Sequence, residues 1–193
     1  MASTEVTLSV EYGQFLILDT NATPDADDPV NGAFANGLAG VGAGGRCATV
    51  LTGTGFGTVP ATLETAGTAP APPASGWQDI VELSMFLPDW GPILLSPDTG
   101  EGCEFPLVDH SAPPPALDTL NGEEWEAANA SHCHWWRLRI HAQGRDTAHA
   151  SEPHERYLIQ AWPAPPTPLA ALKLTDAHGT RLRGKNAQAP ADD

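Results

Sequence analysis

Short alternating runs, separated by segments rich in glycine and proline, constrain the fold of this chain more than any other feature of its sequence. The 193 residues include 19 glycines and 19 prolines, and both residue types destabilise the interior of a helix. Between them, apolar and polar residues alternate, as in Val6–Tyr12 and Trp77–Leu87. This alternation is the period of a β-strand with one buried face. We therefore expect an all-β protein.

The strand pattern recurs along the chain at intervals typical of a sandwich or barrel. We predict a β-sandwich of about ten short strands, jelly-roll-like or immunoglobulin-like, with at most one or two short helices. The predicted strands are Val6–Tyr12, Gln14–Asp19, Cys47–Leu51, Val59–Leu63, Trp77–Leu87, Ile93–Leu95, Glu104–Val108, Cys133–Ala142, Tyr157–Trp162 and Leu169–Leu174.

Helical signals are few. The best candidate covers residues 122–129, because Asn121 can cap its N-terminus and Glu123 and Glu124 suit the dipole of the first turn. Residues 34–40 can form one further turn of helix.

The length suits one domain with a substantial core. We expect a single domain over residues 1–183 and a disordered tail over residues 184–193, which contain no apolar anchor. Central strands of a covered sheet can be apolar on both faces, so core residues are expected on both. The predicted core residues are Leu8, Val10, Phe15, Ile17, Val50, Val81, Leu83, Met85, Trp136, Leu138, Ile140, Leu158, Ile159 and Leu172.

The chain is strongly acidic, with a formal net charge of -15. Residues 1–130 hold 18 acidic residues and one basic residue, Arg46, whereas residues 131–193 hold six acidic and eight basic residues. An acidic surface repels nucleic acid and anionic membranes, which argues against both as direct partners. The charge suits a basic protein partner, although it can also serve solubility alone.

The cysteines and the N-terminal segment indicate in which cellular compartment the protein is expected. The widely spaced Cys47, Cys103 and Cys133 form no Cys-x-x-Cys pair, which argues against a disulfide framework or a zinc ribbon. The first residues show neither the basic region nor the apolar run of a secretory signal. No apolar run is long enough to span a bilayer. We expect a soluble, cytoplasmic protein.

The segment His132–Ala142 carries the most distinctive strand pattern. One face is apolar and is expected in the core: Trp136, Leu138 and Ile140. The other face is polar and aromatic: Trp135, Arg137, Arg139 and His141. Tryptophan and arginine often anchor protein interfaces. This second face is therefore a candidate partner-binding surface, or it pairs internally with the acidic residues of the first 130 positions.

Two histidines at the start of this segment are candidate metal ligands. His132 and His134 lie two positions apart, so they point to one side of a strand and can ligate zinc, with His110 or His154 completing a site. A catalytic zinc site needs a third ligand and supporting hydrogen bonds, and the sequence identifies neither. The alternative to zinc ligation is that His132 and His134 are half-buried residues at the start of a strand.

No motif specifies a reaction. Residues 40–45 match the dinucleotide-binding pattern Gly-x-Gly-x-x-Gly, but a strand is expected after them where that site needs a helix. Residues 53–57 are also glycine-rich and are expected to form a loop or a bulged strand end. A carboxylate pair of the glycosidase type stays open. Its candidates are Glu82, Glu104, Glu123 and Glu124. We expect no cofactor and do not favour an enzyme.

Three segments form a recognisable combination. They are Leu8-Ser-Val-Glu-Tyr-Gly-Gln-Phe15, Gly37-Leu-Ala-Gly40 with the strand behind it, and Tyr157-Leu-Ile-Gln-Ala-Trp-Pro-Ala164. Together they resemble the competence protein J type of bacterial nuclease-inhibitor proteins. The first resembles that family's Ser-x-x-Tyr-x-Gln-Phe opening, and the last resembles its late strand with a Trp-x-x-Pro-like turn. The loops at residues 64–76 and 110–131 look like additions to that pattern.

The resemblance implies a compact β-rich protein that binds and inhibits, or accompanies, a nuclease, and it carries over no catalytic residue. Carboxylates can occupy phosphate positions on a basic enzyme and steer association with it. We therefore expect an acidic protein-binding module, an inhibitor or immunity partner of a basic nuclease or toxin, in an unknown oligomeric state. The alternatives are a metal- or carbohydrate-binding β-sandwich protein or hydrolase that uses His132 and His134, and a self-assembling scaffold.

Overall fold

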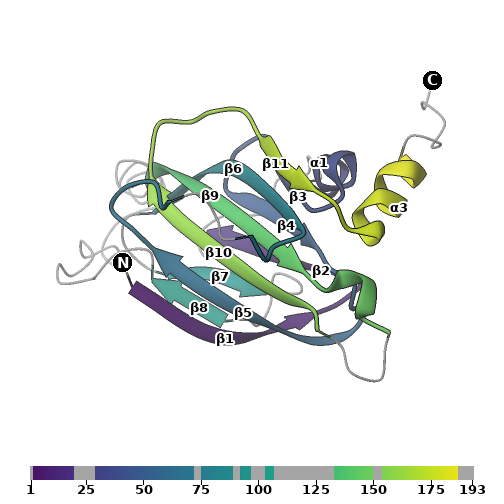
Figure 1. The fold of residues 1–193 in the computed structure, drawn as a ribbon. Helices are drawn as coiled ribbons and strands as arrows, with labels where there is room; N and C mark the ends of the chain where they lie inside the picture. Colours follow the sequence, from purple (N-terminus) through teal and green to yellow (C-terminus); the bar gives the residue numbers. More distant parts are fainter. Residues whose placement is uncertain are drawn as a thin grey trace, which may run out of the picture.

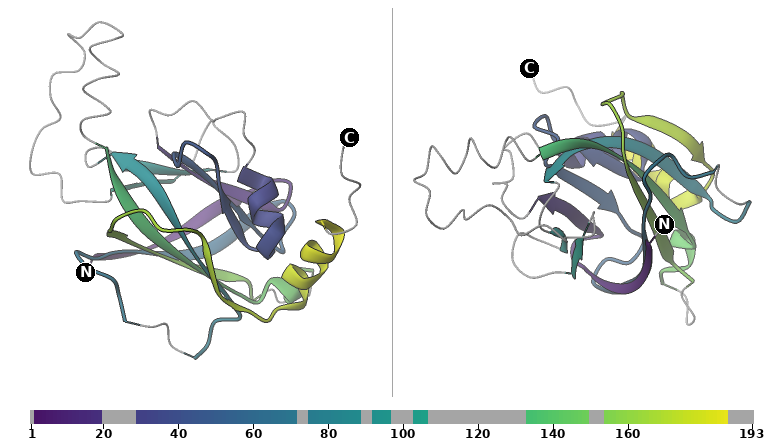
Figure 2. Two further views of the ribbon diagram at one scale, coloured as in Figure 1. Left: turned by 90° about the horizontal axis from the view of Figure 1, so that it is seen from above. Right: turned by 90° about the vertical axis from the view of Figure 1, so that its left-hand side faces the viewer.

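The β-sandwich predicted from the alternating runs is confirmed in the computed structural model, which describes residues 2–19, 29–71, 75–88, 92–96, 103–106, 133–149 and 154–186. Two sheets pack face to face, and α1 and α3 lie beside each other at one side of the molecule (Figures 1 and 2). Each predicted strand overlaps a strand of the structure.

The larger sheet has six strands in the order β1-β5-β10-β9-β6-β11. They are β1 (Ala2–Val10), β5 (Gly57–Thr65), β6 (Asp79–Pro88), β9 (Cys133–Gln143), β10 (Arg156–Pro163) and β11 (Ala170–Leu174). Neighbouring strands are antiparallel except β5 and β10, which are parallel. A parallel pair needs a long crossover, and here the chain forms four strands of the structure, β6, β7, β8 and β9, between β5 and β10.

The smaller sheet has five strands in the order β3-β4-β2-β7-β8. They are β2 (Gln14–Asp19), β3 (Ala39–Val41), β4 (Cys47–Leu51), β7 (Pro92–Ser96) and β8 (Cys103–Pro106). Every residue of β4 is buried, so both faces of this strand are covered, and α1 (Pro29–Asn36) packs against β3 and β4. The sequence did not predict β3, because three residues are too few to show alternation.

Residues from the facing sides of the two sheets form one core. Phe15 on β2 contacts Tyr157 on β10 edge to face, with ring centroids 5.4 Å apart. Most predicted core residues are buried, but Leu158 is half-buried and the prediction for Leu172 is wrong. Leu172 is 51% exposed, because it occupies the irregularity between Ala171 and Lys173 on the edge strand β11.

The helices were predicted only in part. α1 contains the start of the predicted turn at residues 34–40, whose end belongs to β3. The predicted helix at residues 122–129 lies outside the described residues. α3 (Ala177–Asn186) and the short 3-10 helix η2 (Arg145–Thr147) were not predicted, and α3 enters the segment expected as a disordered tail. No helix in the described ranges is long and apolar enough to cross a membrane.

Candidate functional site

The predicted partner-binding face of β9 lies on the side of the larger sheet that faces away from the core. Its alternate residues Trp136, Leu138 and Ile140 are buried in the core, as predicted. Three of the four outward residues are also almost completely buried. They are Arg137 with 5% exposure, Arg139 with 7% and His141 with 0%.

Glu82 on β6 forms ion pairs with both arginines. Its Oε1 accepts a hydrogen bond from Arg139 Nε at 2.7 Å, and its Oε2 accepts one from Arg137 Nε at 3.2 Å. The register explains this arrangement, because Glu82 lies directly opposite Arg139 and Ser84 lies opposite Arg137. Side chains directly or diagonally opposite on one face of a sheet are within contact range.

Two proline-rich segments cover the arginines with backbone carbonyl groups. Arg137 Nη1 donates to Thr167 O at 2.9 Å, and its Nη2 donates to Pro168 O at 3.1 Å. Arg139 Nη1 donates to Ala71 O at 3.0 Å. The connector between β10 and β11 and the segment after β5 are thereby held against the outer face of the sheet.

Arg137, Arg139 and His141 therefore do not present a surface to solvent. Their contacts are those of internal pairing with the acidic first part of the chain, the alternative that the sequence left open. The physical reason lies in the covering segments, which the sequence indicated only as loops. Trp135 is the member of the set that reaches solvent, with 37% exposure, and it packs on Phe86 at a centroid distance of 5.4 Å.

His141 is held neutral in the fold. Its Nε2 lies 3.2 Å from Gln160 Oε1, and the Trp77 ring meets it edge to face at 5.4 Å. Burial, which disfavours the charged imidazole, lowers the pKa of His141 to about 4, and the neighbouring Arg139 charge acts in the same direction.

Because of this pKa, acidification should destabilise the fold. The unfolded state binds a proton near pH 6.5 whereas the folded state does so only near pH 4, so this contribution to stability is complete above pH 6.5 and is lost as the pH falls to 4. Urea unfolding at pH 7.5 and pH 5 should show a loss of about 2 kcal/mol from His141. The H141Q variant, which keeps all other titrating groups, should lack this part of the loss. An equal loss in both proteins would contradict the assignment.

Among the described residues, no metal site is found at the predicted histidine pair. His132 lies outside the described residues, and His134 is an exposed residue of β9. Within the described ranges, no three His, Cys, Asp or Glu side chains are grouped closely enough to hold a metal ion.

A buried arginine that the sequence did not indicate connects the two sheets and α3. Arg145 donates from Nε to Asp176 Oδ2 at 2.6 Å and from Nη2 to Asp79 Oδ2 at 2.6 Å. Its Nη1 donates to the carbonyl oxygens of Gly37 and Leu51 at 2.7 and 3.2 Å. The side chains of all three charged residues are fully buried. No local signal marks Arg145, because it follows a glycine at the end of a strand, as a surface-loop arginine would.

Glu155 fixes the glycine-rich segment at residues 53–57 beside this cluster. It accepts hydrogen bonds from Gly53 N at 2.7 Å and Thr54 N at 2.8 Å. A Cβ atom on Gly53 would lie 2.2 Å from the carbonyl oxygen of Arg145. Glycine is therefore required there by a close backbone approach, a more specific reason than loop flexibility.

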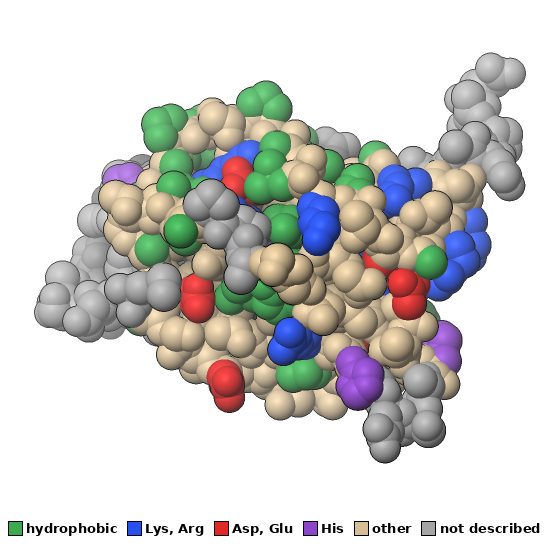
Figure 3. All heavy atoms as spheres, in the orientation of Figure 1, with side chains coloured by type: hydrophobic (Ala, Val, Ile, Leu, Met, Phe, Trp, Pro, Cys, Tyr) green, Lys and Arg blue, Asp and Glu red, His purple; other side chains and the backbone are tan. Residues whose placement is uncertain are grey.

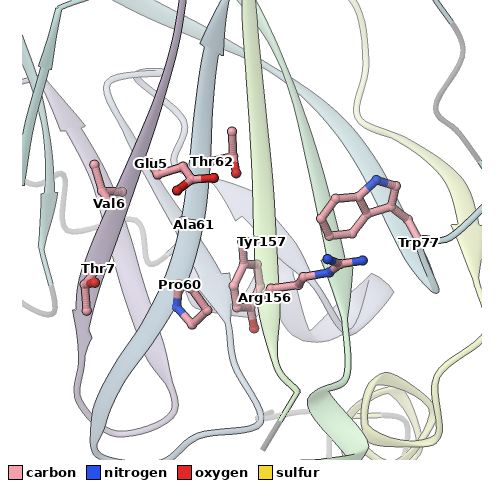
Figure 4. A pocket seen from close by; sticks show the side chains of 9 residues that line it. All are labelled: Glu5, Val6, Thr7, Pro60, Ala61, Thr62, Trp77, Arg156 and Tyr157. Carbon is pink, nitrogen blue, oxygen red and sulfur yellow. The ribbon is translucent and has the colours of Figure 1, made fainter.

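An open hollow of about 430 Å³ lies on the outer side of the larger sheet, across β1, β5 and β10 (Figure 4). Glu5 and Thr62 line one side of it, and Arg156 and Trp77 line the other. The Arg156 guanidinium lies 5.3 Å from the centre of the Trp77 ring. The hollow can accept a side chain, but its lining specifies no reaction.

Comparison with known proteins gives a similarity of fold. No protein-family model matches the chain, and no curated protein sequence matches it. The chain is similar to the crystal structure of ComJ, inhibitor of the DNA degrading activity of NucA, from Bacillus subtilis, with 14% identity over 84% of this chain and 98% of that chain and a TM-score of 0.54. It is also similar to a structure titled Crocagin biosynthetic gene J, with 13% identity over 86% and 100% of the two chains and a TM-score of 0.48. The resemblance inferred from three sequence segments is confirmed at the level of the fold.

Proposed function

We propose that this chain is a protein-binding module that inhibits a basic nuclease. The observation that carries the proposal is the fold shared with ComJ, a nuclease inhibitor, over 98% of that protein's chain. The sequence segments that resemble the competence protein J type point independently to the same class. Arg137, Arg139 and Arg145 are engaged in internal ion pairs.

The distribution of charge supports a basic partner. All nine Lys and Arg residues and ten of the 24 acidic residues lie in the described ranges, so fourteen acidic residues lie outside them. Several of the described basic residues are neutralised internally, as in the pairs of Arg139 with Glu82 and Arg145 with Asp176. The formal net charge of the whole chain is -15, and a net charge of this sign attracts a cationic protein and accelerates association.

The predicted interface needs revision in one respect. Arg137, Arg139 and His141 can contact a partner only if the covering segments leave the sheet, which would break their hydrogen bonds. A rigid-body contact must use exposed residues instead, and Trp135 remains a candidate among the predicted four.

Inhibition can be tested with the DNA-degrading nuclease encoded nearest to this chain's own gene, with NucA as a second enzyme. Equimolar chain should suppress DNA degradation by the first nuclease, and the association rate should fall at least about tenfold between 50 and 500 mM NaCl because charge steers the encounter. An unrelated acidic protein at the same concentration is the control for nonspecific effects of charge. Undiminished activity of both nucleases at a hundredfold excess of the chain would overturn the proposal.

A further inference from the structure

Two exposed aromatic side chains form a pair at one end of the sandwich. Tyr12 lies in the turn between β1 and β2 and is 81% exposed, and Phe56 lies in the loop between β4 and β5 and is 67% exposed. Their rings meet edge to face with centroids 5.0 Å apart and planes at 68°. We call these two residues the aromatic tip. In Figure 1 the β1–β2 turn lies at the same end of the larger sheet as η2.

The backbone beneath the aromatic tip is fixed by hydrogen bonds between the two turns. Gly13 N donates to Gly55 O at 2.9 Å, and Thr52 N donates to Gly13 O at 2.7 Å. The buried carboxylate of Glu155 holds the second turn through two backbone N–H groups. The aromatic tip is therefore presented on a preorganised support, which lowers the entropy lost when a partner binds.

Tyr12 adopts a left-handed backbone conformation in the turn between β1 and β2. Its φ of 52° is the one positive value at a non-glycine residue in the described ranges. A bulky side chain is strained there, and such strain is often retained at functional sites. With 81% exposure, Tyr12 gains little burial in the isolated chain.

The charge around the aromatic tip complements a basic protein. Glu11 is exposed beside Tyr12, and residues 11–13 and 52–57 contain no Lys or Arg. Exposed cations lie over α3, among them Arg181 and Lys185 (Figure 3).

We propose that the aromatic tip is the anchor by which this chain docks into an apolar pocket, bordered by basic side chains, on the inhibited nuclease; this rests on the proposed function. Tyrosine is among the residues enriched at the energetic centre of interfaces. Its ring fills an apolar pocket while its hydroxyl finds a polar partner.

The Y12N/F56S variant tests the anchor without disturbing the fold. Asparagine tolerates the left-handed conformation that position 12 requires, and both rings are largely exposed, so thermal unfolding should be unchanged or slightly improved. The Kd for the inhibited nuclease should rise at least about 30-fold, the size expected for loss of an energetic centre. The matched control is L172S, which removes another exposed apolar side chain on β11 and should bind as the native chain does.

Tyrosine nitration gives a second measurement that needs no substitution. The chain has two tyrosines, and Tyr157 is 1% exposed, with its hydroxyl donating to Glu155 at 2.5 Å. Tetranitromethane should therefore modify Tyr12 in the free chain, and bound nuclease should slow that reaction at least about tenfold if the ring enters a pocket.

The outcomes separate the two proposals. Weak binding by Y12N/F56S with normal binding by L172S, together with protection of Tyr12, supports the anchor. Tight binding by Y12N/F56S, or unprotected Tyr12 in the complex, overturns the anchor and leaves nuclease inhibition in place. Failure of the native chain to bind or inhibit the nuclease overturns both.

Discussion

Replacing Arg145 with methionine is expected to destabilise the protein by about 3–5 kcal/mol, because it leaves two buried carboxylates without their cation. The guanidinium uses all five of its N–H groups, three on Asp79 and Asp176 and two on backbone carbonyls. Burial already raises the pKa of Asp79, so this carboxyl group is the one expected to take up a proton when Arg145 is removed. Urea denaturation at neutral pH measures the loss.

Two further variants isolate the cause of that loss. R156M removes an exposed arginine that stacks on Trp77 and should cost less than about 1 kcal/mol, as expected for a solvent-exposed cation–π contact. The triple variant R145M/D79N/D176N removes the buried charges together and should recover much of the stability, since uncompensated charge is the main penalty. Stability of R145M equal to that of R156M would contradict a structural role for the cluster.

Replacing Glu82 with glutamine is expected to destabilise the protein by about 2–3 kcal/mol, because two buried arginines lose their shared carboxylate. The expected loss is smaller than for Arg145, since the Glu82 side chain is 16% exposed and solvent partly screens the pair. The effect should include release of the covering segments, because Arg137 and Arg139 hold them through backbone carbonyls. Thermal unfolding measures the loss of stability, and hydrogen exchange at the Thr167 amide, which donates to Ser84 Oγ at 3.1 Å, measures release of the connector.

E64Q is the matched control for E82Q. Glu64 lies on the same side of the larger sheet and accepts a hydrogen bond from Gln160 Nε2 at 2.8 Å, but it is paired with no arginine in the described ranges. It should change stability by less than about 1 kcal/mol. A native-like unfolding temperature and unchanged exchange in E82Q would show that the arginines do not depend on the ion pairs.

The ion pairs of Arg137 and Arg139 with Glu82 also affect how the predicted partner-binding face of β9 can be tested. Alanine at both Arg137 and Arg139 is expected to destabilise the fold because it removes these internal pairs. Reduced nuclease binding by that variant would therefore say nothing about a docking surface unless folding were measured alongside. The aromatic tip avoids this ambiguity, since its two residues contribute little buried area.

Sequence patterns alone located every strand of the described residues except β3, and they predicted the sandwich. Alternation in segments such as Gln14–Asp19 and Cys47–Leu51 located strands whose bounds the structure reproduces, because a strand's burial pattern is local and has a period of two. The apolar stripe of Trp136, Leu138 and Ile140 was placed in the core for the same reason. The similarity in fold to ComJ was also indicated by short segments of sequence.

Only the tertiary structure decided which polar residues face solvent. Arg139 is internal because register places it opposite Glu82 on β6 and Gln160 on β10, and strand order and register arise from contacts between distant parts of the chain. Arg145 and the pair of Tyr12 and Phe56 depend likewise on segments that meet only in the folded protein. Local alternation can separate the two faces of a strand, but it cannot show whether another segment covers the outer one.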